Sequence, residues 1–185
     1  GGVHPPGAPP RGVGGDLPDW SAVSGLVGKA EAALGLFSRL VKIASLFVDY
    51  PIEVFDGRPG DRHFAIHVKT PALLAQNFAR ALPEGREGMI VNIIDQRVWR
   101  PTPRYFSYAL SKSALWTQTQ MLAQALGPRI RVNAIGPGPT LKNVRQDDTD
   151  FGAQLAGLIL KRGPELPEFG ATIRYLWDAR SVTGQ

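Results

Sequence analysis

The sequence predicts an α/β domain in which helices flank a parallel β-sheet, and three stretches of its second half carry this prediction. Residues 89–94 form a nearly uninterrupted apolar run, and residues 130–135, directly before Gly136-Pro137-Gly138, are predicted to form a second strand. Apolar runs of this kind are typical of strands buried on both faces of a parallel sheet. Between them, residues 105–127 form a helical segment in which Lys112 is the only charged residue. We therefore expect strand, helix and strand to follow one another in one domain.

The first part of the chain divides into an arm and the beginning of that domain. Residues 1–15 are rich in Gly and Pro and show no period, so we expect a flexible or extended arm before one domain over residues 16–185. Residues 19–34 carry an apolar stripe at helical spacing, with Gly35 as the stop, and residues 36–44 are predicted to form a strand. Residues 51–62 contain several Gly and Pro residues, so we expect a loop there.

A long helix is predicted over residues 61–81, where apolar residues recur every three or four positions. Pro71 lies inside this pattern, so we expect it to kink the helix or to remove one hydrogen bond. His67 lies in the same segment. A histidine titrates near neutral pH and could join a proton relay; the alternative is a packed or solvent-facing side chain.

The loop over residues 96–104 places Trp99 among arginines that include Arg97. An aromatic ring among guanidinium groups could hold a flat, electron-rich ligand by stacking. The alternative is a solvated loop with one hydrophobic anchor.

The helix over residues 105–127, for which Thr102 and Pro103 form a plausible start, is apolar on more than one side. Leu115 continues one side, whereas Leu110 and Met121 line another. A helix of this kind must be covered twice, once by the sheet and once, we expect, by a second subunit. Downstream, residues 167–180 are predicted to be helical, with four residues facing the sheet: Phe169, Ile173, Leu176 and Trp177.

Tyr108 and Lys112 are four residues apart, so they project from the same side of the helix. A phenol has a reference pKa of about 10, and lowering it to about 7 requires roughly 4 kcal/mol of preference for the phenolate. A nearby ammonium can supply about 1–3 pKa units, and an oxidised nicotinamide ring would supply a second positive charge. The pair therefore suits proton transfer beside a hydride carrier. The alternative is a tyrosine packed against a lysine stem.

The segment from Asn92 to Thr140 resembles the short-chain dehydrogenase/reductase family. The carrying features are a strand that ends at Asp95, thirteen positions before Tyr108, the Tyr-x-x-x-Lys pair, and a strand that ends in Pro137-Gly138. The resemblance implies a Rossmann-like, doubly wound parallel sheet, with Tyr108 as general acid/base and Lys112 as its electrostatic partner. A carboxylate at Asp95 is similar to the pteridine and dihydromonapterin reductase branch, in which an Asp works with the Tyr in delivering a proton to a pterin ring. His67 stands where the family has an Asn in its relay.

The same resemblance implies a dinucleotide cofactor, NADP or NAD with NADP preferred, and a homodimer or homotetramer formed through the helices at 61–81 and 105–127. The implied cofactor-binding residues are these: Asp16, Leu17, Ala44, Ser45, Ile93, Tyr108, Lys112, Pro137, Gly138 and Thr140. Residues 141–166 would form a mobile lid over the substrate. The family's first strand, its glycine-rich turn and its last strand are not visible in this sequence, since Gly12, Gly14 and Gly15 lack the preceding strand that such a turn needs. We therefore expect a domain truncated at both ends, with the strand at 36–44 as an open edge.

The composition narrows the function classes. The 185 residues are 43% hydrophobic and 20% charged, which is the balance of a globular domain. The absence of Cys excludes disulfides and thiolate metal sites, and we expect no metal, no membrane span and a cytoplasmic location. The formal charge of +5 comes from scattered residues with no long basic run, so we do not expect nucleic-acid binding. The sequence favours an NAD(P)-dependent oxidoreductase acting on a carbonyl or a pterin-like imine. The alternative is a catalytically silent relative that retains the dimerisation helices without cofactor binding.

Overall fold

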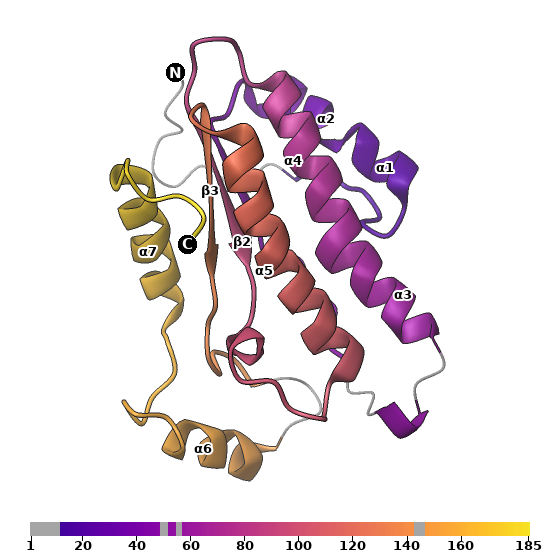
Figure 1. Cartoon of the computed structure of the whole chain (residues 1–185), viewed down its shortest axis with the longest axis vertical. Helices are drawn as coiled ribbons and strands as arrows, with labels where there is room; N and C mark the ends of the chain where they lie inside the picture. Colours follow the sequence, from indigo (N-terminus) through magenta and orange to yellow (C-terminus); the bar gives the residue numbers. More distant parts are fainter. Residues whose placement is uncertain (1–11, 49–51, 55–56, 143–146) are drawn as a thin grey trace.

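A parallel three-stranded sheet forms the centre of the molecule (Figure 1). The computed structural model describes residues 12–48, 52–54, 57–142 and 147–185. The strands are β1 (Arg39–Lys42), β2 (Gly88–Ile93) and β3 (Ile130–Ile135), in the order β1-β2-β3. Val41 pairs with Val91, and Ile90 pairs with Val132. The predicted parallel α/β architecture is confirmed, although β1 is shorter than the strand expected over residues 36–44.

The helical elements occupy the connections between and after the strands. In chain order they are α1 (Trp20–Ser24), α2 (Leu26–Leu34), η1 (Ile52–Val54), α3 (Arg58–Phe64), the π-helix η2 (Ala65–Lys69), α4 (Thr70–Ala81), η3 (Gln96–Val98), α5 (Phe106–Leu126), α6 (Asp148–Ala156) and α7 (Leu166–Asp178). None of the helices in the described part of the chain is long and apolar enough to cross a membrane.

Alternating residues of the strands supply two separate hydrophobic cores. Ile90 faces α4 and α5, where it packs with Phe78 and Val132. Met89 and Val91 face the other side, where they pack against Leu176 of α7. All three β2 side chains are fully buried. The sheet is therefore covered by helices on both faces, as a doubly wound parallel sheet requires, and the predicted packing of Leu176, with Ile173 and Trp177 beside it, is confirmed.

The predicted helix at 61–81 is one helical run with a widened segment in its middle. The π-helix over Ala65–Lys69 directly precedes α4, and Pro71 lies in the first turn of α4. A proline has no backbone N–H and crowds the preceding turn, and the π-helix gives the chain the different register that this requires. The irregularity expected at Pro71 thus lies in the turn before it. Similarly, the helix expected at 19–34 is divided into α1 and α2 at Gly25.

The start of α5 differs from the prediction. The helix begins at Phe106 rather than at Thr102, because Tyr105 before it has a left-handed backbone conformation with φ of 59°. The Thr102 hydroxyl donates to the carbonyl of Arg104 and closes a local turn that is not helical. Along α5, Leu110 and Met121 are 48% and 65% exposed, so no described residue covers the second apolar side of this helix.

The two lateral edges of the sheet differ in their backbone hydrogen bonding. On the β3 side, the backbone N–H of Gly184 donates to Val132 and that of Ala134 donates to Gln185, so the last residues run along the outer edge of β3 without forming a strand. On the β1 side, no described strand pairs with the outer edge, and a largely apolar hollow of about 540 Å³ lies between β1, α2 and α4. The open edge expected for this strand is therefore present among the described residues. Residues 1–11 of the expected arm lie outside them, and residues 12–15 form neither helix nor strand.

Candidate active site

The carboxyl ends of the three parallel strands gather the predicted functional segments at one edge of the sheet. Ala44 and Ser45 follow β1, Asp95 follows β2, and residues 136–140 follow β3. This edge lies at the lower end of the sheet in Figure 1, toward α6. A cavity of about 240 Å³ opens there, and Asp95, Tyr108, Gly138 and Thr140 are among its lining residues. A segment of the expected lid, α6, contributes Phe151 to the same cavity.

Asp95 and Tyr108 are directly hydrogen-bonded. The Tyr108 hydroxyl donates to Asp95 Oδ2 at 2.9 Å. Arg97 holds the carboxylate from the other side, with Nη1 at 3.2 Å from Oδ1 and 3.1 Å from Oδ2, while the backbone N–H of Arg97 donates to Oδ1 at 2.8 Å. Asp95 also caps the short helix η3 through that backbone contact. Arg97 thus holds the Asp95 carboxylate in the position from which it accepts the hydrogen bond of the Tyr108 hydroxyl.

The electrostatics of Tyr108 differ from the expectation. Burial and the neighbouring Asp95 carboxylate raise the pKa of Tyr108 above its ordinary value, whereas Arg97 and a hydrogen bond from Ser45 lower it by less. Burial lowers the pKa of Lys112 to about 8, against which Asp95 acts more weakly. Lys112 Nζ donates to the carbonyl of Ile93 at 2.8 Å and lies 5.8 Å from the centre of the Tyr108 ring. The expected lowering of the Tyr108 pKa by Lys112 is therefore not seen, and the phenol is held neutral.

His67 is buried behind Tyr108 and is part of a polar chain. Its Nε2 accepts from the backbone N–H of Leu46 at 3.2 Å, so this nitrogen carries no proton, and it also lies 2.9 Å from the Ser45 hydroxyl. Its Nδ1 is 2.7 Å from the Ser111 hydroxyl. Burial lowers the pKa of His67 to about 3, with smaller contributions from Lys112 and His63. Hydrogen-bonding groups therefore run from Tyr108 through Ser45 and His67 to Ser111.

His63 is a residue that sequence reasoning missed. It lies one helical turn before His67, its ring stacks on that of His67 at 5.7 Å, and its Nδ1 is 2.8 Å from Ser107. Both histidine rings meet Tyr108 edge-on, at 5.9 and 5.5 Å. The repeated pattern of His63 with Ser107 and His67 with Ser111 is visible in the sequence only as two pairs of residues four apart.

Trp99 and Arg97, both in the loop over residues 96–104, lie in different places: Arg97 lines the cavity and Trp99 does not. Trp99 packs against Trp116 at 5.7 Å and lies over Gly136, where a Cβ atom would be 2.6 Å from the indole. Trp99 does not line the cavity, so the expected stacking platform is not formed by this residue. The aromatic rings at the cavity are instead those of Phe47, Tyr105, Tyr108 and Phe151.

The predicted cofactor residues fall into two groups. Ile93, Tyr108 and Lys112 are close to one another, and Gly138 and Thr140 line the cavity beside Tyr108, with the Thr140 hydroxyl donating to the carbonyl of Gly138. Pro137 accepts from the backbone N–H of Gln96 on the same edge. Leu17 and Ala44 line the hollow beside β1 instead, and Asp16 next to Leu17 is exposed. The donor set thus fits the nicotinamide–ribose half of a dinucleotide, because Lys112 has two further N–H donors without a partner among the described residues. No glycine-rich turn suited to the phosphates lies within the described residues.

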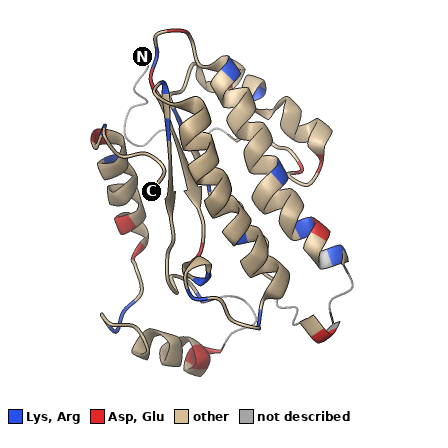
Figure 2. Cartoon of the chain, viewed as in Figure 1, with Lys and Arg blue, Asp and Glu red and all other residues tan. Residues whose placement is uncertain are grey.

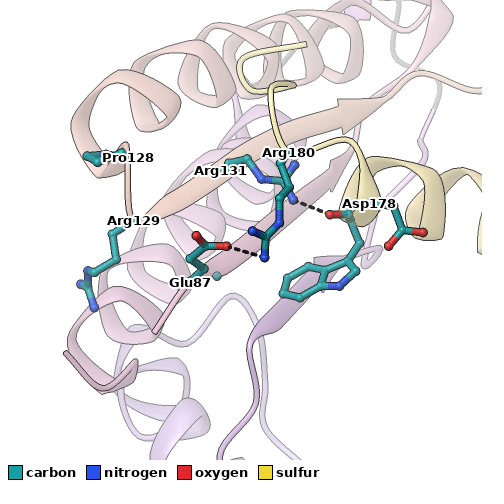
Figure 3. A pocket seen from close by; sticks show the side chains of 8 residues that line it. Glu87, Pro128, Arg129, Arg131, Asp178 and Arg180 are labelled. Carbon is teal, nitrogen blue, oxygen red and sulfur yellow. Dashed lines mark hydrogen bonds and ion pairs between the residues drawn. The ribbon is translucent and has the colours of Figure 1, made fainter. Parts of the chain in front are cut away.

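At the amino ends of the strands a second hollow, of about 250 Å³, contains several arginines (Figure 3). Arg131 donates to the carbonyls of four residues at the end of α7, at 2.6–3.1 Å: Leu176, Trp177, Ala179 and Val182. Arg129 donates to the carbonyls of Ala79 and Leu82 at the end of α4. Charged residues occur at both ends of the molecule (Figure 2), but here the two guanidinium groups close helix ends.

The parallel sheet with helices on both faces and a cavity at its carboxyl edge places the chain in the Rossmann-like class of α/β folds. A sequence model described as short chain dehydrogenase matches residues 7–151, and the chain belongs to this family. The chain is 31% identical over 177 residues to a dihydromonapterin reductase of Klebsiella pneumoniae, covering 90% of this chain and 72% of that protein. It is 35% identical over 151 residues to an L-xylulose reductase of Caenorhabditis elegans, covering 78% of this chain and 60% of that protein.

A solved structure of the FolM alternative dihydrofolate reductase 1 from Brucella suis, in complex with NADP, is similar in fold and sequence. The TM-score is 0.89 and the identity is 55%, with 92% of this chain and 68% of that chain covered. The corresponding Brucella canis protein, also complexed with NADP, has a TM-score of 0.85 and 54% identity, with 92% and 67% covered. The predicted family and its similarity to the dihydromonapterin reductase branch are thus confirmed.

Proposed function

We propose that this chain is an NAD(P)-dependent reductase that acts on a pterin-like imine or a carbonyl, with Tyr108 as the proton donor. The observation that supports this most directly is the hydrogen bond from the Tyr108 hydroxyl to Asp95, at the cavity where the carboxyl ends of the strands meet. Similarity to a dihydromonapterin reductase and to an alternative dihydrofolate reductase favours the pterin-like substrate.

Reduction of a C=N or C=O bond consumes one hydride and one proton. A phenol whose pKa is raised by burial and by Asp95 keeps its proton until a more basic acceptor reaches it. Arg97 and Asp95 hold the hydroxyl in place, and Lys112 lies near enough to stabilise the phenolate that proton donation leaves behind. A proton would then return to Tyr108 through the Ser45 hydroxyl, which takes one from solvent, and the neutral His67, whose Nε2 accepts from Ser45, would hold Ser45 in place.

The residues that would hold the cofactor are Ile93, Lys112 and the segment 137–140 on one side and Leu17, Ala44 and Ser45 on the other. NADP is preferred, because similar solved structures are described as NADP complexes. The bound reduced dinucleotide would supply the hydride.

Two measurements test this proposal. Calorimetry or tryptophan fluorescence should show saturable NADPH binding, and the loss of NADPH absorbance should report turnover with dihydromonapterin or dihydrofolate. If no saturable NADPH binding is found at millimolar concentration, the reductase proposal fails for this chain.

The second candidate function is that of a catalytically silent relative. It is favoured by the open edge of β1 and by the absence, among the described residues, of a glycine-rich turn for the phosphates. The NADPH titration separates the two candidates, since the silent relative would remain folded and would not bind.

We further propose that the protein is a cytoplasmic homodimer or homotetramer, with α5 and the 61–81 helices at the interface. The exposed Leu110 and Met121 on α5 support this arrangement. Light scattering should give a dimer or tetramer that Met121→Glu converts to monomers, whereas Lys161→Glu, at an exposed position after α6, should leave the assembly unchanged.

A further inference from the structure

The carboxylate of Asp95 is saturated by its own neighbours. An ionised carboxylate offers about four lone-pair positions. Oδ1 accepts from the backbone N–H and from Nη1 of Arg97, and Oδ2 accepts from Nη1 of Arg97 and from the Tyr108 hydroxyl. Asp95 therefore has no remaining acceptor position with which to bind a substrate, and its action is confined to Arg97 and Tyr108.

Arg97 has the opposite property, because part of its donor set is unused. Its Nη1 is engaged with both oxygens of Asp95, whereas Nε and Nη2 have no partner among the described residues. The side chain is 18% exposed and lines the cavity together with Tyr108. A guanidinium has five N–H donors in a planar fork, so three donors remain available at this cavity.

The guanidinium of Arg97 also lies close to two aromatic rings. It lies over Tyr105, with 4.6 Å from Cζ to the ring centre, and it is 5.6 Å from the centre of the Phe47 ring. The two rings contact each other at 4.7 Å. Tyr105 has a left-handed backbone, which costs roughly 1–3 kcal/mol in a residue other than Gly and is retained where the surroundings enforce it. Its bonds to Asp95 and its contacts with the two rings therefore restrict how the Arg97 guanidinium can turn.

We propose that Arg97 is the specificity-determining residue of this site and that it hydrogen-bonds the acceptor edge of a flat heteroaromatic ring. This proposal rests on the proposed reductase function and names the group that reads its substrate. A planar guanidinium fork matches a ring edge on which a carbonyl oxygen lies beside a ring nitrogen, as it does for guanine in nucleic acids. A pterin ring presents such an edge; in a dihydropterin the ring nitrogen on this edge is the imine nitrogen that takes the Tyr108 proton, so there Arg97 donates to the carbonyl oxygen. The cavity of about 240 Å³ is at or below the lower end of typical ligand pockets, which suits a single fused ring system.

Equilibrium binding of unsubstituted pterin, followed by its own fluorescence, tests the proposal on the whole chain without any dinucleotide. In Arg97→Met the Kd should rise about 10- to 100-fold, the change expected for loss of hydrogen bonds from a charged donor. Arg97→Lys keeps the positive charge beside Asp95, so the site should stay folded, yet it lacks the flat fork and should weaken binding by about tenfold.

Arg100→Met is the matched control, since Arg100 lies in the same segment, carries the same charge, is exposed and does not line the cavity. Its Kd for pterin should remain within about twofold of the original value, as expected for a surface residue without a ligand contact. L-Xylulose serves as the non-aromatic probe, and its binding should be weaker than that of pterin and insensitive to Arg97→Met.

Three results would overturn the proposal: pterin binding that is equal in Arg97→Met and the original chain, pterin binding that is absent at millimolar concentration, or preferential binding of L-xylulose. Failure of the reductase function gives a different pattern. If pterin binds through Arg97 but NADPH does not bind, the ring-reading role stands and the reductase proposal falls.

Discussion

Polar side chains are used differently at the two ends of the sheet. At the amino ends, Arg129 and Arg131 donate to backbone carbonyls where α4 and α7 finish. At the carboxyl ends, Asp95 accepts from the side chains of both Arg97 and Tyr108, and its contact with the backbone N–H of Arg97 caps the short helix η3. The charged groups at the amino ends therefore bind backbone carbonyls at helix ends, whereas those at the carboxyl ends line a cavity.

This difference separates stability from chemistry. A carbonyl at a helix end that loses its donor must find water or stay unsatisfied, so the amino-end arginines contribute to folding. The carboxyl-end side chains bond mainly to other side chains at the cavity, so substitutions there should alter binding and proton transfer more than the free energy of unfolding.

The largest effect should come from Tyr108→Phe, which removes one oxygen from the carboxyl end. Turnover should fall about 10²- to 10⁴-fold, the usual contribution of a positioned general acid. The free energy of unfolding should fall by about 1–3 kcal/mol, because the hydrogen bonds of the hydroxyl with Asp95 and Ser45 are lost. NADPH binding should persist. Steady-state kinetics measures the loss of turnover, and urea unfolding measures the free energy of unfolding. Retained turnover would show that the proton comes from another group.

Acid pH should destabilise the protein through His67. Its pKa is about 3 in the fold against an ordinary 6.5, so the unfolded chain binds a proton first and the free energy of unfolding falls as pH drops from 6.5 toward 3. The slope for this group is at most about 1.4 kcal/mol per pH unit. Urea unfolding of His67→Gln across this window should show a shallower decline than the original chain. Parallel curves would contradict the assignment. His63→Gln provides the comparison, since burial lowers the pKa of His63 in the same direction.

At the amino end, Arg131→Met should lower the free energy of unfolding by about 2–3 kcal/mol, since its guanidinium serves four carbonyls at the end of α7. Pterin affinity should be unchanged, because Arg131 lies at the opposite end of the strands from the cavity. Thermal or urea unfolding measures the first effect and fluorescence titration the second. A large loss of pterin affinity in Arg131→Met, with an unchanged free energy of unfolding, would show that the amino end takes part in binding and contradict the difference between the two ends.

The smallest effect should come from Arg180→Met in the same hollow. Arg180 pairs with Glu87 at 3.4 Å, but the two side chains are 79% and 67% exposed. An exposed pair of this kind contributes little, so the free energy of unfolding should change by less than about 0.5 kcal/mol. A change as large as that of Arg131→Met would mean that exposed charge, rather than closure of the helix ends, stabilises this end of the sheet.

The elements and the pairing of Tyr108 with Lys112 on one helix followed from the sequence, because apolar periodicity and helical spacing are local properties. The sequence pattern predicted too early a start for α5. The helix begins only after Tyr105, whose left-handed backbone conformation is not expected for a tyrosine. The pattern also left open whether Trp99 stacks on a ligand or anchors the loop, and the structure places the ring on Gly136 and Trp116. The neighbours of an aromatic side chain depend on segments that are distant in the chain.

The sequence by itself determined which strands are buried, that they follow a parallel α/β pattern, and that a phenol, an ammonium and a carboxylate belong to one edge. Only the tertiary structure decided how those groups interact. Arg97 saturates Asp95, Lys112 turns to the carbonyl of Ile93, and burial raises rather than lowers the pKa of Tyr108. The physical reason is that residue spacing fixes direction along one element, whereas desolvation and hydrogen-bond partners are set by the elements that pack around it.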